Sequence, residues 1–253
     1  MTASLTDAPV RAARGLRRVH RLSVAAAAVV LALTAVSMTD RPTPCGDLPA
    51  RYPPIVAFEL ARSAADLEAL FGGPDPAIAP CRRTMIAAMD TVNHVDLALF
   101  TPGYALFLIA AFVGLRRRGR ARAGAGIALA ALAAVADVVE NACLLGLTPT
   151  LDPTSSWLAL LPWATGVKWL ALGGAGAVAA VALWSGPRRR HRVSAALCVL
   201  APLATIAAVA DPHRFGPMVG GAVGLSWLAL LIDGVVQARA PLPAGRPSGP
   251  LPD

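Results

Sequence analysis

Three polar residues close together interrupt a long apolar run in the middle of the chain. Asp137, Glu140 and Asn141 form the pattern D-x-x-E-N, and residues three and four positions apart share one face of an α-helix. Two carboxylates that lie close in a low dielectric cannot both ionise cheaply, so one should keep a proton or gain a cationic partner. Lys168, the only lysine in the chain, lies in the next apolar run and is the available cation.

These charged residues support two interpretations. Ionisable side chains inside a membrane are costly and often mark a functional site, so Asp137, Glu140 and Lys168 are candidate catalytic residues that exchange protons. The alternative is a buried salt-bridge network that only fixes the register of the helices. Counted from the outer ends of their runs, both carboxylates lie ~10–15 Å deep. Lys168 lies at an overlapping level, in the outer half of the bilayer.

The apolar run before Asp137 adds weaker candidates. Tyr104 lies at the depth of the carboxylates, on a polar strip with Asn93, His94 and Thr101, whereas Asp96 points about 100° away from that strip. Pro102 is expected to loosen the helix there. A metal site built from His94, Asp96 and the two carboxylates lacks any metal-ligand spacing, so we expect no metal and no cofactor.

Other residues in the apolar runs have structural interpretations. Asp233 lies near the inner end of the last run and is expected to reach the cytoplasmic interface. Glycines at 173, 174 and 176, and the G-x-x-x-G pair Gly220 and Gly224, predict close contacts between helices. Cys143 and Cys198 are expected to be small apolar core residues.

Six apolar runs of about 17 to 28 residues organise the chain, the length an α-helix needs to cross a bilayer. They cover residues 22–38, 95–115, 123–147, 157–184, 193–210 and 216–236. The chain is 56% hydrophobic and 15% charged, against about a quarter charged in soluble domains. We therefore predict an all-α, multi-pass membrane protein with about six spans and one exported loop, whose last five spans form a bundle over residues 95–236.

The arginines predict the orientation. If the chain crosses the membrane at each run, one side holds both ends of the chain and the loops after runs two and four, and this side has sixteen arginines. The other side holds the loops after runs one, three and five and has six arginines. The side richer in arginine is expected to be cytoplasmic. This places the protein in the plasma membrane with both termini in the cytoplasm. Residues 1–21 would then be a basic cytoplasmic segment, and residues 237–253 a disordered tail. Because the basic residues separate apolar runs and do not alternate with aromatics, we expect no nucleic-acid partner.

The first run has a second interpretation. Its basic leader, Ala-rich core and the tripeptide Ala35-Val36-Ser37 are also typical of a cleavable signal peptide. Both interpretations export the loop that follows, residues 39–94.

The exported loop carries two predicted features. Cys45 and Cys81 both lie in it, on the oxidising side of the membrane, where two cysteines tend to pair. Residues 55–71 show apolar side chains at helical spacing with charges between them, which predicts one amphipathic helix ending at Gly72. That helix is too short and too charged to span, so it should lie on the outer membrane surface or cap the bundle.

Several short motifs in this order resemble an uncharacterised family of polytopic bacterial membrane proteins. The motifs are FELA on the exported helix, then DLALFTPGY, then DVVEN, then a lone lysine before a tryptophan, over residues 55–184. Leu97 stands where the family pattern has an aromatic residue. The resemblance implies a shared polar site and no particular reaction. Position by position, it adds Glu59, Asp96, Tyr104 and Asn141 as ligand-binding candidates beside Asp137, Glu140 and Lys168.

Three functions fit these observations. The first is a helical bundle whose polar pocket binds or modifies a lipid or amphiphile, with the bilayer as its other partner. The second is a proton-coupled transporter of small solutes that uses the carboxylates as a relay, although no internal repeat is visible. The third is a structural membrane protein whose buried ion pair only specifies packing.

Overall fold

The computed structural model describes residues 7–39, 42–185 and 189–239 and contains no strand within them. Six long helices dominate: α1 (Asp7–Thr39), α5 (Thr101–Arg117), α6 (Ala123–Leu147), α7 (Ser156–Trp184), α8 (Arg189–Ala210) and α9 (Pro212–Arg239). The other elements are α2 (Pro54–Glu59), α3 (Ala64–Phe71), the 3-10 turn η1 (Pro76–Ile78), α4 (Ala79–Val95) and the π-helical turn η2 (Asp96–Phe100). Helix α4 is as long as α5, at 17 residues each, and leads into it through η2. The predicted all-α class is confirmed. Most of the predicted tail, from residue 240 onward, lies outside the described residues.

Five segments of the described chain are long and apolar enough to cross a membrane. They are Pro76–Arg117, Ala123–Leu147, Ser156–Trp184, Arg189–Ala210 and Pro212–Arg239. Each contains or closely overlaps one of the last five predicted spans, and the chain is therefore a multi-pass membrane protein. The first segment begins at Pro76, well before the predicted start at residue 95, because α4 extends the helix into the predicted exported loop. The first predicted span, 22–38, is the second half of α1, which begins at Asp7 within the predicted basic segment. Its crossing of the membrane stays a prediction, because the side chains of its last residues lie outside the described part.

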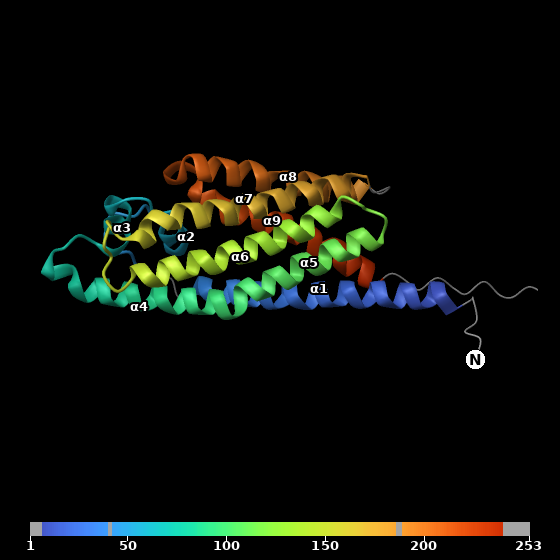
Figure 1. Cartoon of the computed structure of the whole chain (residues 1–253), viewed down its shortest axis with the longest axis horizontal. Helices are drawn as coiled ribbons and strands as arrows, with labels where there is room; N and C mark the ends of the chain where they lie inside the picture. The colour runs from blue at the N-terminus through green and yellow to red at the C-terminus, as the bar shows by residue number, and fades with distance from the viewer. Residues whose placement is uncertain (1–6, 40–41, 186–188, 240–253) are drawn as a thin grey trace, which may run out of the picture.

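The six long helices form a closed ring. Each contacts the next in the order α1, α5, α6, α7, α8, α9, and α9 returns to α1 (Figure 1). Helices α6 and α7, joined by the short turn at residues 148–155, pack side by side (Figure 1). Helix α1 contributes Ala26, Ala27 and Val30 to the core, and its Ser23 hydroxyl donates to the Phe107 carbonyl oxygen at 3.3 Å. It packs as a wall of the bundle.

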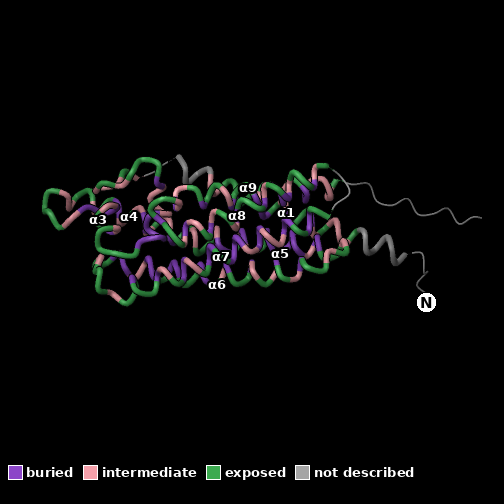
Figure 2. The backbone as a smooth tube through the Cα atoms, turned by 90° about the horizontal axis from the view of Figure 1, so that it is seen from above, coloured by how far each residue is buried: buried purple, intermediate pink, exposed green. Residues whose placement is uncertain are grey.

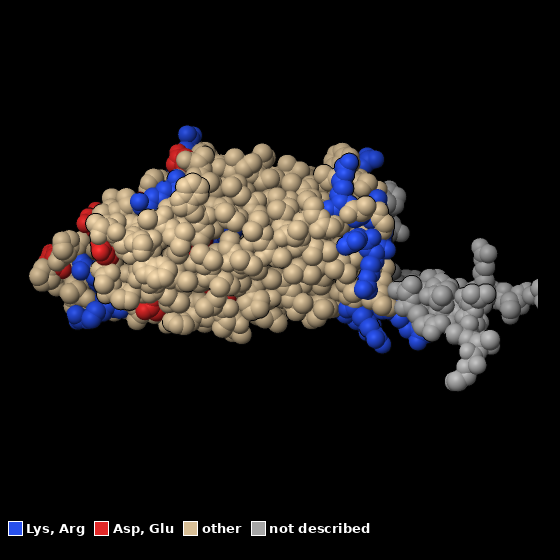
Figure 3. Space-filling view, viewed as in Figure 1, with Lys and Arg blue, Asp and Glu red and all other residues tan. Residues whose placement is uncertain are grey.

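The outside of the ring is apolar along its length. Large apolar side chains on it are widely exposed, including Trp163 (76%), Val135 (63%) and Leu203 (61%). In Figure 3 this uncharged belt separates two charged ends. Apolar surface of this extent would be costly in water and is expected of a surface that faces lipid. Figure 2 shows the complementary pattern, with the buried residues facing the inside of the ring.

The two ends of the bundle differ in composition. One end carries the arginines of residues 116–122 and 189–192 and is called the arginine end below. The other end carries α2, α3 and the Cys45–Cys81 disulfide, whose Cα atoms are 5.9 Å apart, and is called the disulfide end. The predicted disulfide is confirmed. It joins the segment after α1 to the start of α4.

The single helix predicted for residues 55–71 is wrong, because the structure has two short helices there. Helix α2 ends at Glu59 and α3 begins after Ser63. The Ser63 hydroxyl oxygen accepts from the Asp66 amide, while the Asp66 carboxylate accepts from the Arg62 amide at 2.8 Å. This reciprocal cap satisfies the donors at the start of α3, and so a new helix starts there.

These two helices cap the bundle. Phe58 and Phe71 pack edge to face, with ring centroids 5.0 Å apart, in an apolar cluster that also contains Met85, Leu144 and Leu161. Helix α3 ends at Gly72, whose φ of +75° favours glycine. Because α2 contacts α6, α7 and α9, its last residue can reach the interior of the ring.

Candidate functional site

Lys168 lies inside the ring and contacts three carboxylates. The side chain, on α7, is only 6% exposed, and its Nζ pairs closely with Glu140 Oε1 on α6. The same Nζ lies 3.2 Å from Asp137 Oδ1 and 3.2 Å from Glu59 Oε2. The predicted pairing of Lys168 with Asp137 and Glu140 is confirmed. Spacing on α6 explains it, because residues three apart present both carboxylates to the neighbouring helix.

Glu59 reaches this cluster from the disulfide end. It is the last residue of α2, and its backbone carbonyl oxygen accepts from the Thr165 hydroxyl of α7 at 2.8 Å. The residue is 8% exposed. Burial raises the pKa of the Glu59 carboxyl above its usual range, while the Lys168 ammonium opposes that rise. The capping helices therefore supply one of the three carboxylates around Lys168.

Asn141 and Thr101 connect the acidic residues to one another. The Asn141 amide donates to Asp96 Oδ2 at 2.7 Å and to the Asp137 carbonyl oxygen at 3.0 Å. The Thr101 hydroxyl donates to Asp137 Oδ2 at 2.6 Å. These hydrogen bonds place Asp96 at the edge of the same cluster. Sequence periodicity had predicted that Asp96 points away from the strip that contains Thr101.

The local geometry of η2 accounts for the position of Asp96. Pro102 has no amide hydrogen to donate to the carbonyl four residues earlier, and its ring crowds that carbonyl. The helix widens there, and the Thr101 amide donates to the carbonyl oxygen of Asp96, five residues before it. The expected loosening near Pro102 is confirmed, and the wider turn rotates Asp96 toward the face that carries Thr101.

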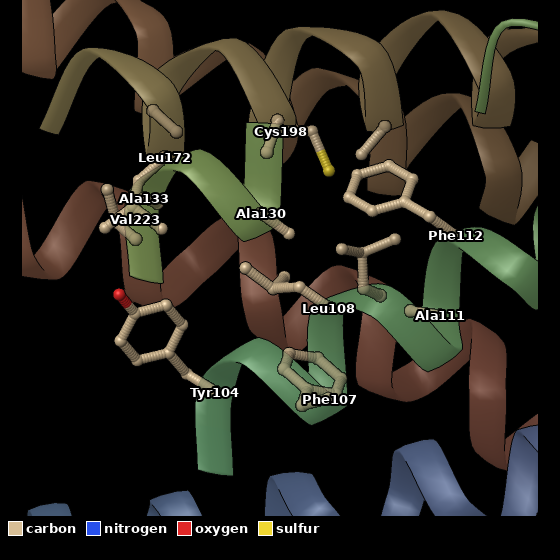
Figure 4. Close-up of a cluster of buried hydrophobic side chains, with 14 of the residues drawn as sticks. Tyr104, Phe107, Leu108, Ala111, Phe112, Ala130, Ala133, Leu172, Cys198 and Val223 are labelled. Carbon is tan, nitrogen blue, oxygen red and sulfur yellow. The ribbon is translucent and has the colours of Figure 1, made fainter. Parts of the chain in front are cut away.

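Tyr104 lies beside the carboxylates within an aromatic group. It is 1% exposed and stacks on Trp227 of α9, with centroids 5.4 Å apart, while Phe100 lies 5.8 Å away. Figure 4 shows its ring extending from α5 toward Ala133, Leu172 and Val223. Its hydroxyl lies near Asp137 but forms no regular hydrogen bond with any described residue.

A cavity of about 470 Å³ adjoins these residues. Its charged lining consists of Glu59, Asp96, Asp137 and Lys168. Most of its remaining lining is apolar and comes from α1, α5 and α9. Several rim residues are exposed on the outside of the ring, including Leu31 (53%), Val95 (40%) and Leu228 (44%). The cavity therefore opens sideways, through the lipid-facing surface.

The opening lies where α1 and α9 separate. Toward the arginine end the two helices pack closely, and a Cβ built at Gly234 would lie 3.6 Å from Val24. Gly220, Gly221 and Gly224 line the cavity on α9, and a Cβ at any of them would meet no atom of the described residues within 4 Å. The predicted close contact at the Gly220/Gly224 pair is wrong, whereas Gly173 and Gly176 do pack against α8 as expected.

Some predicted residues lie elsewhere. His94 is exposed, and its Nδ1 contacts the Asp90 carbonyl oxygen of its own helix at 2.7 Å, so the metal arrangement considered for it does not form. Asp233 lies beside residues of the arginine end, the level expected for it, but it is buried there, with 7% exposed. It pairs closely with Arg118 and lies 3.7 Å from His191 Nε2. The salt bridge to Arg118 explains its burial.

Two lining residues escaped the sequence analysis. Trp227 was not considered, although Gly220, Gly224 and Trp227 share one helical face and the tryptophan could have indicated a cavity there. Trp169 was noted only as a neighbour of Lys168; its ring centroid lies 5.0 Å from the Lys168 Nζ, and its side chain lines the cavity.

No protein-family model, curated protein or solved structure matches this chain. The resemblance to an uncharacterised membrane protein family therefore stays a prediction. The roles of the site residues rest on their geometry alone.

Proposed function

We propose that the protein binds a lipid or another amphiphile, with the head group against Lys168 and its carboxylates and the apolar tail between α1 and α9. The observation that carries this proposal is the cavity of about 470 Å³, which has a charged inner end, apolar walls and a rim on the lipid-facing surface. An amphiphile matches this gradient of polarity along its own length. A water-soluble ligand would leave the apolar walls unmatched.

The proposal includes an orientation in the plasma membrane. The arginine-rich loops favour the cytoplasm for the arginine end and for both termini. The cavity adjoins the disulfide end, so it would open into the outer leaflet. An outer-leaflet lipid, or an amphiphile arriving from outside the cell, could then enter sideways without crossing the membrane.

The cavity wall offers a direct test. We expect Gly224→Phe to obstruct the opening, because a Cβ there meets no described atom within 4 Å. Gly166→Phe on α7 is the matched control, since its Cβ is equally unobstructed but the residue does not line the cavity. Native mass spectrometry of protein purified in a maltoside detergent should show about tenfold less retained lipid for Gly224→Phe only. Equal retention by both variants and the unaltered chain would refute the proposal.

The transporter alternative has less support. A proton relay needs titratable groups along its path. The described interior between the carboxylate cluster and Asp233 is mostly apolar, with His20 of α1, buried beside Gly114, as the exception. That region is filled by residues such as Leu108, Phe112 and Ala130 (Figure 4). A proton-flux assay in liposomes would separate the alternatives, and we expect no flux above that of empty liposomes.

A further inference from the structure

The charged lining of the cavity is predominantly acidic. Three carboxyl groups line it, those of Glu59, Asp96 and Asp137, against the single ammonium of Lys168. Glu140 is fully buried, pairs closely with Lys168 and is not among the lining residues. The positive charge of Lys168 is therefore balanced by Glu140, which a ligand in the cavity would not contact.

This arrangement disfavours an anionic head group. A phosphate or carboxylate in a head group that has no positive charge of its own would need a cation with free donors, and Lys168 already contacts three carboxylates. Neither arginine nor a second lysine lines the described cavity. An anion would also approach the carboxyl groups of Asp96 and Asp137, and like charges in a low dielectric repel strongly.

The aromatic side of the cavity favours a cation. Phe100, Tyr104 and Trp227 all line it, and their ring centroids lie 5.4 to 6.2 Å from one another. Aromatic faces attract organic cations, most strongly where water is excluded. The Asp96 carboxylate stands one turn before Phe100, so carboxylate and rings line the same space.

We propose, on the basis of the amphiphile-binding function above, that the ligand's head group is an organic cation, an ammonium on an apolar tail. Its positive charge lies between the carboxylates of Asp96 and Asp137 and the rings of Phe100, Tyr104 and Trp227. The tail follows the apolar wall toward Gly220 and Gly224. Both a bilayer lipid with an amino head group and a free alkylammonium compound have this chemistry.

The test ranks head groups on the unaltered chain, so it does not depend on the folding of a variant. Protein in a maltoside detergent is incubated with phosphatidylethanolamine, phosphatidylglycerol or diacylglycerol of matched acyl chains, and bound lipid is measured by native mass spectrometry. We expect phosphatidylethanolamine to bind about tenfold more tightly than the other two. Decyltrimethylammonium, which has no phosphate, should displace it, whereas decanol should not.

Matched variants show which residues produce the preference for a cationic head group. Asp96→Asn and Trp227→Leu should each reduce the preference for the cation about tenfold. Asp47→Asn, at an exposed carboxylate of the disulfide end, and Trp163→Leu, at a lipid-facing tryptophan, should leave it unchanged. Thermal unfolding of each variant shows whether it is folded.

The outcomes separate the two proposals. Equal binding of the three lipids, still reduced by Gly224→Phe, overturns the cationic head group and leaves amphiphile binding intact. Tighter binding of phosphatidylglycerol, or failure of decyltrimethylammonium to displace phosphatidylethanolamine, also overturns it. If no lipid is retained in a Gly224-dependent way, amphiphile binding itself fails.

Discussion

At the scale of single residues, Lys168 and the carboxylates around it are mutually dependent. Removing the ammonium leaves Glu59, Asp137 and Glu140 close together in a low-dielectric interior, where like charges repel. Breaking a buried ion pair from one side typically costs about 3–5 kcal/mol, because the remaining charge is uncompensated. The free energy of unfolding should therefore respond to the charge balance of the whole cluster.

We predict that Lys168→Met lowers the free energy of unfolding by about 3–5 kcal/mol. Adding Asp137→Asn and Glu140→Gln should recover much of the loss, and Glu59→Gln should recover more, because Glu59 is the third partner. Arg51→Met, at an exposed residue, is the control. The measurement is denaturant unfolding in detergent micelles. A triple variant as unstable as Lys168→Met would contradict the electrostatic explanation.

Thr101 gives a smaller prediction at the same scale. Thr101→Val keeps the shape of the side chain but removes the donor to Asp137, and a hydrogen bond to a charged group is worth about 1.5–3 kcal/mol. Thr91→Val, where the exposed hydroxyl only donates to its own helix, should be nearly neutral. The same unfolding assay compares the two, and equal effects would show that the Thr101 bond does not stabilise the fold.

The cost of burying charge explains which site residues the sequence revealed. Asp137, Glu140 and Lys168 lie in apolar runs, so each demanded a partner. Glu59 lies in a polar loop where a carboxylate needs no explanation, and only the family resemblance singled it out. Trp227 carries no charge and stands in an apolar run, so only its place on the helical face of Gly220 and Gly224 distinguishes it from a lipid-facing tryptophan such as Trp163.

At the scale of elements, the turn η2 positions one side of the site. We predict that Pro102→Ala restores the regular helical hydrogen bond and rotates Asp96 away from Asn141. Amphiphile binding should weaken about tenfold while thermal stability stays equal or rises. Pro202→Ala on α8, within a helix that does not line the cavity, is the control. Unchanged binding by Pro102→Ala would mean that the turn has no role in placing Asp96.

The disulfide positions the other side of the site, because it holds the capping helices that carry Glu59. Reduction should destabilise the protein by roughly 3–4 kcal/mol at most, since the membrane already restrains both ends of the loop. A reductant should therefore lower the melting temperature of the unaltered chain and also its retention of lipid. The double variant Cys45→Ser, Cys81→Ser should not respond to the reductant, and a response there would assign the effect to another group.

The elements differ in how far the sequence predicted them. Membrane length and hydropathy locate the apolar part of a span, and so five spans were predicted in the right places. They do not show that the helix of the span at 95–115 continues back to Pro76, because residues 76–94 are too polar to stand out. The break between α2 and α3 depends on a side-chain cap, Ser63 with Asp66, which the apolar spacing of residues 55–71 concealed. The cap signature S-x-x-D was visible in the sequence and would have separated the two helices.

At the scale of the whole molecule, the opposed ends predict one topology. Ala50→Cys, at an exposed residue of the disulfide end, should react with a membrane-impermeant maleimide on intact cells, and Arg122→Cys, exposed at the arginine end, only after lysis. The free Cys143 and Cys198 are buried and should stay unlabelled. The reverse labelling pattern would show that the protein has the opposite orientation, with its cavity opening into the inner leaflet.

The closed ring has a consequence for the order in which the cavity is built. Of these helices, α1 is synthesised first and α9 last. The two nevertheless contact each other toward the arginine end and together form the cavity opening. During synthesis α1 can dock on α5 as soon as α5 inserts, but the second wall of the cavity is missing until α9 arrives. A nascent chain halted before α9 would expose the carboxylate cluster to the surrounding lipid. Cleavage of α1 as a signal peptide would remove the first wall, so the cavity between α1 and α9 exists only while α1 is retained.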